Sequence, residues 1–514
     1  MDLGYNQIAS VTAEVFDSWS EALATLNLKG NRLAQLAGDV FPASLPLREL
    51  VLSFNELYHV DAAVFANLTT LQVLELSSTL FSGEFPLATP SNLLSWLSLD
   101  NNNIHYVTIQ DMKHFPSLEY LNLDFNKIIE FPSEVFGTTN NGSGRLKELR
   151  LSYNYISKIN YEFLAEQKEL QSLDLSYNRI HNVSEHSFAN LLNLVYLNLA
   201  GNTVQFVADR AFSRLPKLEV LDLQENRIVE FSTDSFENIS SDQINFSVNV
   251  SYNKITSLVG GGPTVFINIL DLSHNLLETL SKGFFNSLGP SLRQLVLSNN
   301  HLTHIDYLAL GSLPKLEILI LHHNNISAVK RRAFGELSTL QILDLSRNRL
   351  VQLSVEQFHN MRRLRHLRLD ANELRALPRD VFKNTVLEHL DLSDNQLTIF
   401  PSSALAQVGF TLRRLELARN RLEYLDAAMF HSIPFLGATW RCWRWRRMRR
   451  RATPARCHRA PAQCPRAPRR RCCGSCCCTR SVSVCTQPRA VPSDCDICKT
   501  RNTPTWCRKR TICM

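Results

Sequence analysis

Residues 173–191 read LDLSYNRIHNVSEHSFANL, and the pattern in this stretch decides the fold. Two Leu residues flank a single position, an Asn follows three residues later, and a Phe follows ten residues after the Asn. The stretch before it, LRLSYNYISKINYEF at 149–163, and the stretch after it, LNLAGNTVQFVADRAF at 197–212, repeat the Leu-x-Leu pair and the Asn. Self-similarity at a fixed period indicates a repeat architecture.

The Asn that follows the Leu-x-Leu pair recurs along most of the chain, most often every 24 residues. It stands at Asn6, Asn31, Asn55, Asn102, Asn126, Asn154, Asn178, Asn202, Asn226, Asn253, Asn275, Asn300, Asn324, Asn348, Asn372, Asn395 and Asn420. Thr79 occupies one further position in the register, between the third and fourth of these, so the pattern predicts about 18 repeats.

Each recurring position has a physical role. The two Leu alternate with period 2, so each pair predicts a short strand with both Leu on one face. The Asn amide can bond backbone groups that the turn leaves unpaired, and stacking would extend these bonds into a ladder. The Phe should line up as one aromatic spine. Its members are Phe16, Phe41, Phe65, Phe136, Phe188, Phe212, Phe236, Phe285, Phe334, Phe358, Phe382 and Phe430.

These motifs resemble the leucine-rich repeat family over about residues 1–440. The resemblance implies an α/β solenoid, the horseshoe of that family, with a parallel sheet on its concave side and loops and short helical turns on its convex side. Ordinary amphipathic helices would need apolar residues spaced by three and four. A sustained Leu-x-Leu pair with a fixed Asn does not supply that spacing.

Charge and cysteine divide the chain in two. The whole sequence carries 55 basic and 48 acidic residues, but 441–514 alone holds 20 basic and 2 acidic ones, which leaves 1–440 with a net charge of −11. All 13 Cys lie between Cys442 and Cys513, so the array of repeats needs neither a disulfide nor a zinc ion. The sequence predicts two regions, an array at 1–440 and an Arg/Cys/Pro-rich tail at 441–514.

Both ends depart from a complete array. The first residues, MDLGYNQI, already belong to a repeat, without a signal peptide or a polar capping unit. We expect an array truncated at its N-terminus, or else an authentic cytosolic solenoid. The repeat register stops after Leu436, and we expect 441–514 to be disordered or to be translated non-coding or frame-shifted sequence. A basic tail that binds nucleic acid or a membrane surface is the alternative.

The sequence carries no recognisable enzyme signature, so we expect no catalytic site, no cofactor and no metal ion. The stretch VGGGP at 259–263 lacks the Gly-Lys-Ser/Thr of a phosphate loop. Cys495 and Cys498, with Cys507 and Cys513, could ligate zinc, but they lie in a Cys-rich run without apolar periodicity. No stretch of about 18 apolar residues predicts a membrane span.

Seven Asn-x-Ser/Thr sequons give mild support for a secreted protein. They begin at Asn67, Asn141, Asn182, Asn238, Asn245, Asn249 and Asn325. Asn249 lies between two residues expected to point inward, Val248 and Val250, so a glycan on it would obstruct part of the concave face.

The outward positions of the predicted strands form columns. The residue between the two Leu is acidic at Glu75, Asp174, Asp222, Asp271, Asp344, Asp391 and Glu416, and it is Arg at Arg150 and Arg368. Aromatic residues precede several of the Asn or stand six residues before them. We expect five to form one exposed binding patch: Tyr120, Phe125, Tyr153, Tyr177 and Tyr196. The plainer alternative is that these residues are ordinary filler of the repeat.

A large surface without catalytic groups indicates a binding protein, and two classes compete. The first is an extracellular binding or adhesion protein, which the sequons favour. The second is a cytosolic scaffold, which only the missing signal peptide favours.

Within the leucine-rich repeat family, the array most resembles the photoreceptor adhesion proteins of insects. This resemblance implies a glycosylated protein on the extracellular face of the plasma membrane, held by an anchor missing from this chain. It also implies that the partner is a protein, the same protein on an apposed cell, and not nucleic acid. Toll-like and other receptor ectodomains share the repeat but usually carry Cys-rich caps, which the array lacks.

Overall fold

The computed structural model describes residues 1–434. It leaves out 20, 62, 84–90, 92, 108–113, 131–144, 160, 162–163, 165–166, 240–244, 282, 308, 311–312, 331–332, 335–336 and 360 within that range. The fold below is that of the described residues, which all lie in the unit Met1–Met448. Three sequence predictions fall outside the described residues: the tail at 441–514, the sequon at Asn141 and the spine residue Phe136.

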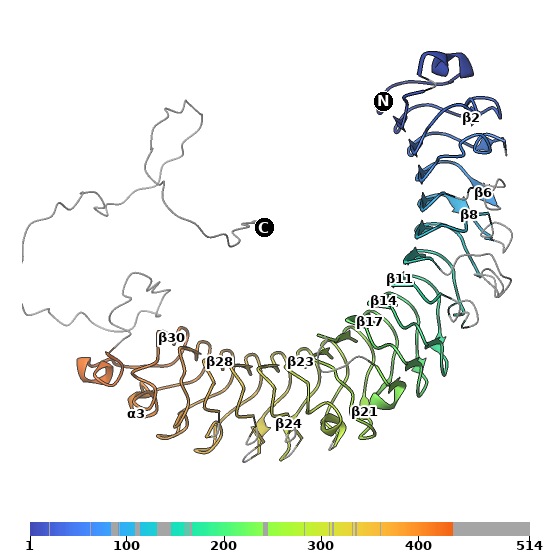
Figure 1. The fold of residues 1–514 in the computed structure, drawn as a ribbon. Helices are drawn as coiled ribbons and strands as arrows, with labels where there is room; N and C mark the ends of the chain where they lie inside the picture. The colour runs from blue at the N-terminus through green and yellow to red at the C-terminus, as the bar shows by residue number, and fades with distance from the viewer. Residues whose placement is uncertain are drawn as a thin grey trace, which may run out of the picture. The chain divides into compact units, whose positions relative to one another are not determined.

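One long parallel sheet organises this unit (Figure 1). Its 17 strands have three residues each, and each strand pairs with the next one along the chain. They are β1 (Thr25–Asn27), β3 (Glu49–Val51), β5 (Val73–Glu75), β7 (Trp96–Ser98), β9 (Tyr120–Asn122), β10 (Glu148–Arg150), β11 (Ser172–Asp174), β14 (Tyr196–Asn198), β17 (Val220–Asp222), β20 (Ser247–Asn249), β22 (Ile269–Asp271), β23 (Gln294–Val296), β25 (Ile318–Ile320), β27 (Ile342–Asp344), β28 (His366–Arg368), β29 (His389–Asp391) and β30 (Arg414–Glu416). An isolated parallel bridge between Asp2 and Asn27 adds the first repeat.

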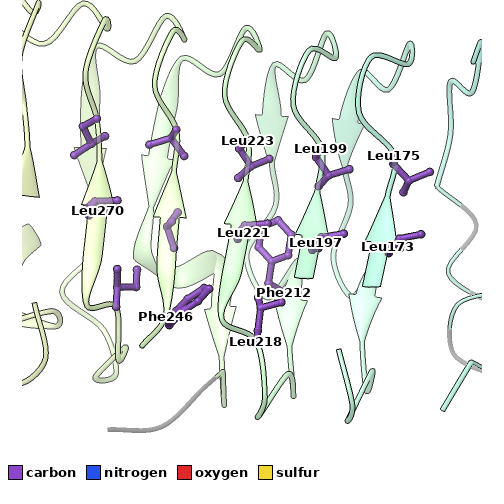
Figure 2. Packing of buried hydrophobic residues seen from close by; sticks show 14 of the residues in the cluster. Leu173, Leu175, Leu197, Leu199, Phe212, Leu218, Leu221, Leu223, Phe246 and Leu270 are labelled. Carbon is purple, nitrogen blue, oxygen red and sulfur yellow. The ribbon is translucent and has the colours of Figure 1, made fainter. Parts of the chain in front are cut away.

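The strands are short because each repeat has only one residue to bury between two outward ones. The middle residue of every long-sheet strand is buried, as Leu173 is in β11 and Leu197 in β14. The register aligns these middle residues from strand to strand, so Leu173 pairs with Leu197 and Leu197 with Leu221. Figure 2 shows them in one row of the core. The first and third residues of each strand therefore face away from the core.

Most of the predicted Asn side chains lie buried in the turns that follow the strands; Asn102 and Asn420 are half-buried, and Asn6 in the first repeat is exposed. Asn178 is typical: its Oδ1 accepts the backbone N–H of Ile156 at 3.0 Å, and its Nδ2 donates to the carbonyls of Leu151 at 2.8 Å and Leu175 at 3.1 Å. From Asn31 onward, each Asn thus joins its own turn to the preceding repeat. Thr79 occupies the equivalent place and donates its hydroxyl to Asn102 Oδ1 at 2.6 Å.

The Phe residues form separate stacks, so the prediction of one continuous spine is wrong. Phe188, Phe212 and Phe236 stack with ring centroids 5.7 and 5.6 Å apart. Phe358 and Phe382 form a second stack, and Phe16 packs against Phe41. The series is interrupted because some repeats place another residue there; Gly262 and Pro263 lie at this point of the repeat that begins at Asn253.

The Phe stacks also account for the side toward which the unit bends. Ring centroids are 5.6 to 6.1 Å apart in the stacks that join successive repeats, whereas neighbouring strands lie about 4.8 Å apart. Because the repeats are wider apart at the rings than at the strands, the unit curves with the long sheet on its inner side, as Figure 1 shows.

The convex side carries short strands and single helical turns. The paired strands are β2 (Gln35–Leu36) with β4 (His59–Val60), β6 (Ser82–Gly83) with β8 (Asn103–Ile104), β12 (Asn182–Val183) with β15 (Phe206–Val207), β13 (Phe188–Ala189) with β16 (Phe212–Ser213) and β19 (Phe236–Glu237), β18 (Glu230–Ser232) with β21 (Ser257–Val259), and β24 (His304–Ile305) with β26 (Ala328–Val329).

Helical structure is sparse among the described residues. It consists of the 3₁₀ turns η1 (Ala13–Trp19), η2 (Thr233–Ser235), η3 (Phe284–Asn286) and η4 (Ala427–Phe430) and the α-helix α3 (Ser402–Leu405). The solenoid is therefore mainly β, and the α/β label overstates its helix content. A repeat of 24 residues spends about half its length on the strand and the Asn turn, which leaves too few residues for a stable convex helix.

Candidate functional site: the concave face

The residue before each ladder Asn adopts a left-handed backbone conformation in all 18 repeats. Its φ angle lies between +52° and +68°. The residues of this pre-Asn column are Tyr5, Gly30, Phe54, Ser78, Asn101, Phe125, Tyr153, Tyr177, Gly201, Glu225, Tyr252, His274, Asn299, His323, Arg347, Ala371, Asp394 and Arg419. Only two are Gly, although left-handed φ normally favours Gly. The hydrogen bonds of the following Asn hold the turn in this conformation for the other residue types.

The pre-Asn column brings three of the five predicted patch residues into one stack. Phe125 and Tyr153 lie with ring centroids 4.3 Å apart and planes at 8°, and Tyr153 and Tyr177 follow at 4.4 Å and 11°. The stack ends over Gly201, where an added Cβ would lie 2.4 Å from the Tyr177 ring. The ring faces cover one another, so this surface presents ring edges and hydroxyls to a partner.

Tyr120 and Tyr196 lie in a different column, at the first residue of their strands. Tyr120 stacks on Trp96, with centroids 3.4 Å apart. Burial raises the pKa of the Tyr120 hydroxyl to about 12, so it is protonated at neutral pH. Glu148 and Ser172 occupy the two strands between Tyr120 and Tyr196. The structure thus divides the five predicted residues between two columns.

The third residue of each strand forms a column with a structural role. In nine strands it is Asp or Asn, and its Oδ1 accepts the backbone N–H two residues later at 2.8 to 3.1 Å. These residues are Asn27, Asn122, Asp174, Asn198, Asp222, Asn249, Asp271, Asp344 and Asp391. This Asx turn guides the chain out of the strand. The recurrence of Asp in the sequence therefore has a local structural cause.

Asp222 shows how charged and neutral side chains are distributed along the third-residue column. Burial raises the pKa of its carboxyl, while the N–H of Gln224 and the side chain of Asn249 lower it. Asn198 and Asn249 are its register neighbours, so amides separate it from Asp174 and Asp271. This alternation limits repulsion between like charges on adjacent strands.

The two Arg of this column are held by carboxylates. Arg150 donates to Asp124 at 2.7 Å, and the Asp124 side chain is almost fully buried. Arg368 contacts Asp344 at 3.3 Å and Asp370 at 3.2 Å. Because these guanidinium groups already have anionic partners, they organise the concave face rather than offer free charge to a ligand.

Eight strands of the long sheet have a residue other than Asp or Asn in the third-residue column, and among them β23 and β25 are the neighbouring pair with aliphatic side chains there. These two strands carry Val296 and Ile320, which cannot form the Asx turn. Ile318 lies on the same outward face of β25, and Ile342 is its register partner on β27. Val296 pairs with Ile320. These four half-exposed side chains form a contiguous group, which we call the aliphatic patch.

Polar groups border the aliphatic patch. Asp271 precedes Val296 and Asp344 follows Ile320 in the third-residue column. An apolar centre within a polar rim is the arrangement of a protein-binding hot spot. The sequence prediction considers the acidic residues of this column and does not include the aliphatic patch. The signal is present in LEILIL at 316–321, which has aliphatic residues at both outward positions of one strand.

The sequons occupy different settings. Asn182, Asn238 and Asn245 have exposed side chains. Asn249 lies on the concave face, where its Nδ2 donates to Gln224 Oε1 at 3.1 Å. Asn67 donates to the carbonyl of Phe41 at 3.2 Å, and Asn325 is half-buried.

Among the described residues, no group of three or more His, Cys, Asp or Glu is placed to hold a metal ion. Within the same residues, no helix has the length and apolarity needed to cross a bilayer.

Histidines beside the aliphatic patch predict a pH dependence of stability. Burial lowers the pKa of His322; burial and the neighbouring His322 lower that of His323. Their Nδ1 atoms are 2.8 Å apart. Below about pH 6.5 the unfolded chain therefore binds more protons than the folded chain, and stability falls as pH falls. We expect His322→Asn/His323→Asn to lose less stability than the parent between about pH 7.5 and 5.5.

The measurement is the urea midpoint at both pH values. Carboxylates such as Asp370, whose pKa burial raises, are common to both proteins and cancel in the difference. His301→Asn, a change at an exposed histidine, is the control and should behave like the parent. An equal pH response of the double variant and the parent would contradict this account of the His pair.

Comparison with known proteins agrees with this architecture. The family described as leucine rich repeat matches residues 144–204, 193–249, 267–326, 314–374 and 362–409. Lumican of Oryctolagus cuniculus is 34% identical over 140 residues, which are 27% of this chain and 69% of that sequence. Lumican of Mus musculus is 34% identical over 141 residues, but the match spans 39% of its length. Leucine-rich repeats and immunoglobulin-like domains protein 1 of Homo sapiens is 33% identical over 137 residues, or 12% of its length.

Solved structures share the fold. A chain of the glycosylated Toll–Spatzle complex of Drosophila superposes with a TM-score of 0.59 at 22% identity, covering 78% of this chain and 51% of that chain. The repeat pattern, the strand and Asn columns, the family match and the lumican relatives lead to one conclusion: this chain belongs to the leucine-rich repeat family.

Proposed function

We propose that this chain is an extracellular cell-surface protein that binds protein partners through its concave face, and that its role is homophilic cell adhesion. The aliphatic patch is the observation that carries the proposal. At Val296 and Ile320 the chain gives up the Asx turn that nine other strands use, and it leaves aliphatic side chains only partly buried instead. A binding partner would bury the remaining aliphatic surface on this solvated sheet face.

The family comparison supports protein binding in a general way. The Toll chain that shares this fold was solved in a glycosylated form and in complex with a protein, Spatzle. Three exposed sequons in this chain suit a glycosylated extracellular protein. A relative's binding partner does not transfer at this level of identity, so these likenesses support the class of function only.

The choice of homophilic adhesion rests on a closer resemblance of the repeats. Phrases such as LDLSYNRI at 173–180, LEVLDLQENRI at 218–228 and LQILDLSRNRL at 340–350 resemble chaoptin. Chaoptin is an insect photoreceptor protein that mediates homophilic adhesion from a lipid anchor. A receptor ectodomain of the Toll type is the second candidate, because the Toll chain shares the fold.

Display on cells tests the proposal. The full chain, given a signal peptide and a lipid anchor, should reach the surface of non-adherent cells with N-glycans and should make those cells cluster with one another. A mass decrease on glycosidase treatment that disappears when all seven sequon Asn become Gln would show the glycans. Labelled cells of the same line that do not display the protein should stay outside the clusters.

The alternatives give different results in the same cells. A receptor ectodomain would reach the surface with glycans but leave the cells dispersed. A cytosolic scaffold that is directed into the secretory pathway would not fold there and would not reach the cell surface. Either result would overturn the adhesion proposal.

A further inference from the structure

The last three strands of the long sheet carry basic side chains along the edge where the strands begin. Their first residues, His366, His389 and Arg414, are aligned by the strand register. His366 and His389 lie with ring centroids 4.6 Å apart. This row runs across β28, β29 and β30, beyond the aliphatic patch.

The residues just before these strands form a second row. Glu388 donates its backbone N–H to the carbonyl of Arg365 at 2.8 Å, and Arg413 donates to the carbonyl of Glu388 at 2.8 Å. The Glu388 carboxylate contacts Arg365 at 3.0 Å and Arg413 at 3.4 Å. One carboxylate thus serves two guanidinium groups whose side chains are 56% and 72% exposed, and several N–H donors remain available.

Two more exposed arginines, Arg362 and Arg363, lie in the turn that leads into β28. We call the whole group the basic strip: Arg362, Arg363, Arg365, His366, His389, Arg413 and Arg414. The strip contains five Arg, and Glu388 is the carboxylate that lies among them, in contact with Arg365 and Arg413. The nearest other acids, Asp391 and Glu416, stand two residues further along β29 and β30 and bound the strip on the concave side.

The same edge of the sheet is mixed in charge earlier in the array. The basic residues Arg48, Arg145, Lys147, Lys168 and Lys217 alternate there with Glu49, Glu119, Glu148, Glu169 and Glu219. Lys147 is already paired with Glu119 at 2.8 Å. The excess of exposed guanidinium groups is therefore a local feature of the last strands and not a property of the fold.

We propose that the basic strip binds a sulfated polysaccharide. The proposal rests on the extracellular location proposed above, where such polymers occur. Arg365 and Arg413 stand in one row across the starts of β28 and β30, with Glu388 between them, and Arg414 adds a third guanidinium at the start of β30. Guanidinium groups that recur along one line suit a linear chain of sulfates and carboxylates. Each guanidinium can donate two parallel hydrogen bonds to such a group. Nucleic acid would also need free ring faces for base stacking, whereas the two rings within the strip, His366 and His389, lie against one another with centroids 4.6 Å apart.

The test must resolve individual residues, because the sequence 441–514 adds 18 Arg and 2 Lys to the affinity of the full chain for any polyanion. The full chain is treated with an arginine-selective dicarbonyl reagent, with and without heparin at physiological salt, and modification is read by peptide mass spectrometry. Heparin should slow the modification of Arg362, Arg363, Arg413 and Arg414 by about fivefold or more when the site is mostly occupied. Arg48 and Arg145, exposed on the same edge, are the internal controls and should react at an unchanged rate.

Three further ligands decide the chemistry. Desulfated heparin should give little protection, because sulfate supplies most of the charge. Protection of the strip by single-stranded DNA or by poly-glutamate equal to that by heparin would overturn the polysaccharide assignment in favour of nucleic acid or an acidic protein segment. Equal protection of the strip and the control arginines, or no protection of the strip, would overturn the site itself.

A variant provides a second check. Arg362→Gln/Arg363→Gln/Arg413→Gln/Arg414→Gln should abolish the protection of Arg365, whereas Arg48→Gln/Arg145→Gln/Lys168→Gln/Lys217→Gln removes the same charge and should retain it. Retained protection of Arg365 in the strip variant would contradict the site. Because neither readout involves cells, failure here leaves the adhesion result standing, and failure of adhesion leaves this result standing.

Discussion

Replacing Phe212 by Ala is expected to lower the free energy of unfolding by about 3–5 kcal/mol. The Phe212 ring is fully buried and lies between Phe188 at 5.7 Å and Phe236 at 5.6 Å. Its removal leaves a cavity that touches three repeats, and the flanking rings cannot close it without disturbing the short strands that carry them. The loss should appear as a lower urea midpoint and as faster amide exchange in β14 and β17.

Phe206→Ala is the matched control for this change. The Phe206 ring is 61% exposed, although it lies only six residues earlier on β15. The control should shift the midpoint little. Similar midpoints for the two variants would contradict the role given to the Phe stack.

Replacing Asn178 by Leu is expected to lower the free energy of unfolding by about 3 kcal/mol or more. Several buried backbone groups lose their hydrogen-bond partner, and each such loss costs about 1–3 kcal/mol. The N–H of Ile156 loses its acceptor, and the carbonyls of Leu151 and Leu175 lose their donor. Leu has the same branching as Asn but can make none of these bonds. The left-handed backbone at Tyr177 would also lose the contacts that hold it.

Arg179→Ala is the control for the Asn ladder. The Arg179 side chain is exposed, and its guanidinium lies 4.1 Å from the centroid of the Tyr155 ring. Loss of that cation–π contact should cost about 0.5–1 kcal/mol. Urea denaturation of both variants measures the difference, and equal midpoints would show that Asn178 has no special structural role.

The repeat register made the main features of the fold predictable. A Leu-x-Leu pair with period 2 specifies which strand residues point inward, and a polar Asn at a fixed later position specifies the turn. Asn249 illustrates the reliability of this inference: it lies half-exposed between the fully buried Val248 and Val250, as alternation predicts. Convex elements were less predictable because the convex sequence has no strict period.

The left-handed column could not be read from residue type. Its members include Tyr153, Glu225, Arg347 and Ala371, none of which favours positive φ. The neighbouring Asn imposes this conformation, and the stacked repeats complete its hydrogen bonds, because each Asn Nδ2 also donates to a Leu carbonyl of the preceding repeat. Aromatic residues at this column therefore stack on one another, whereas Tyr120 at the strand start stacks on Trp96.

The candidate site needed both sequence and structure. The sequence identifies Asp at the third strand residue, but only the hydrogen bond that the N–H of Ser176 donates to Asp174 Oδ1, at 2.9 Å, explains it as an Asx turn. Once that structural role is known, Val296 and Ile320 stand out among the eight strands without it as two neighbouring aliphatic residues that are only partly buried. Function is best sought where a repeat departs from the rule that its fold requires.

Clustering of cells that display variants of the aliphatic patch tests the central claim most directly. Ile318→Lys/Ile320→Lys places two charges on the outward face of β25 without touching the buried Leu319. It should reduce clustering at least about tenfold, because each desolvated charge opposes the contact by more than about 1.4 kcal/mol. Val355→Lys/Ile399→Lys changes two exposed aliphatics outside the long sheet and should cluster like the parent. Clustering of the Ile318→Lys/Ile320→Lys cells at the level of the parent would contradict the assignment of the concave face as the binding surface.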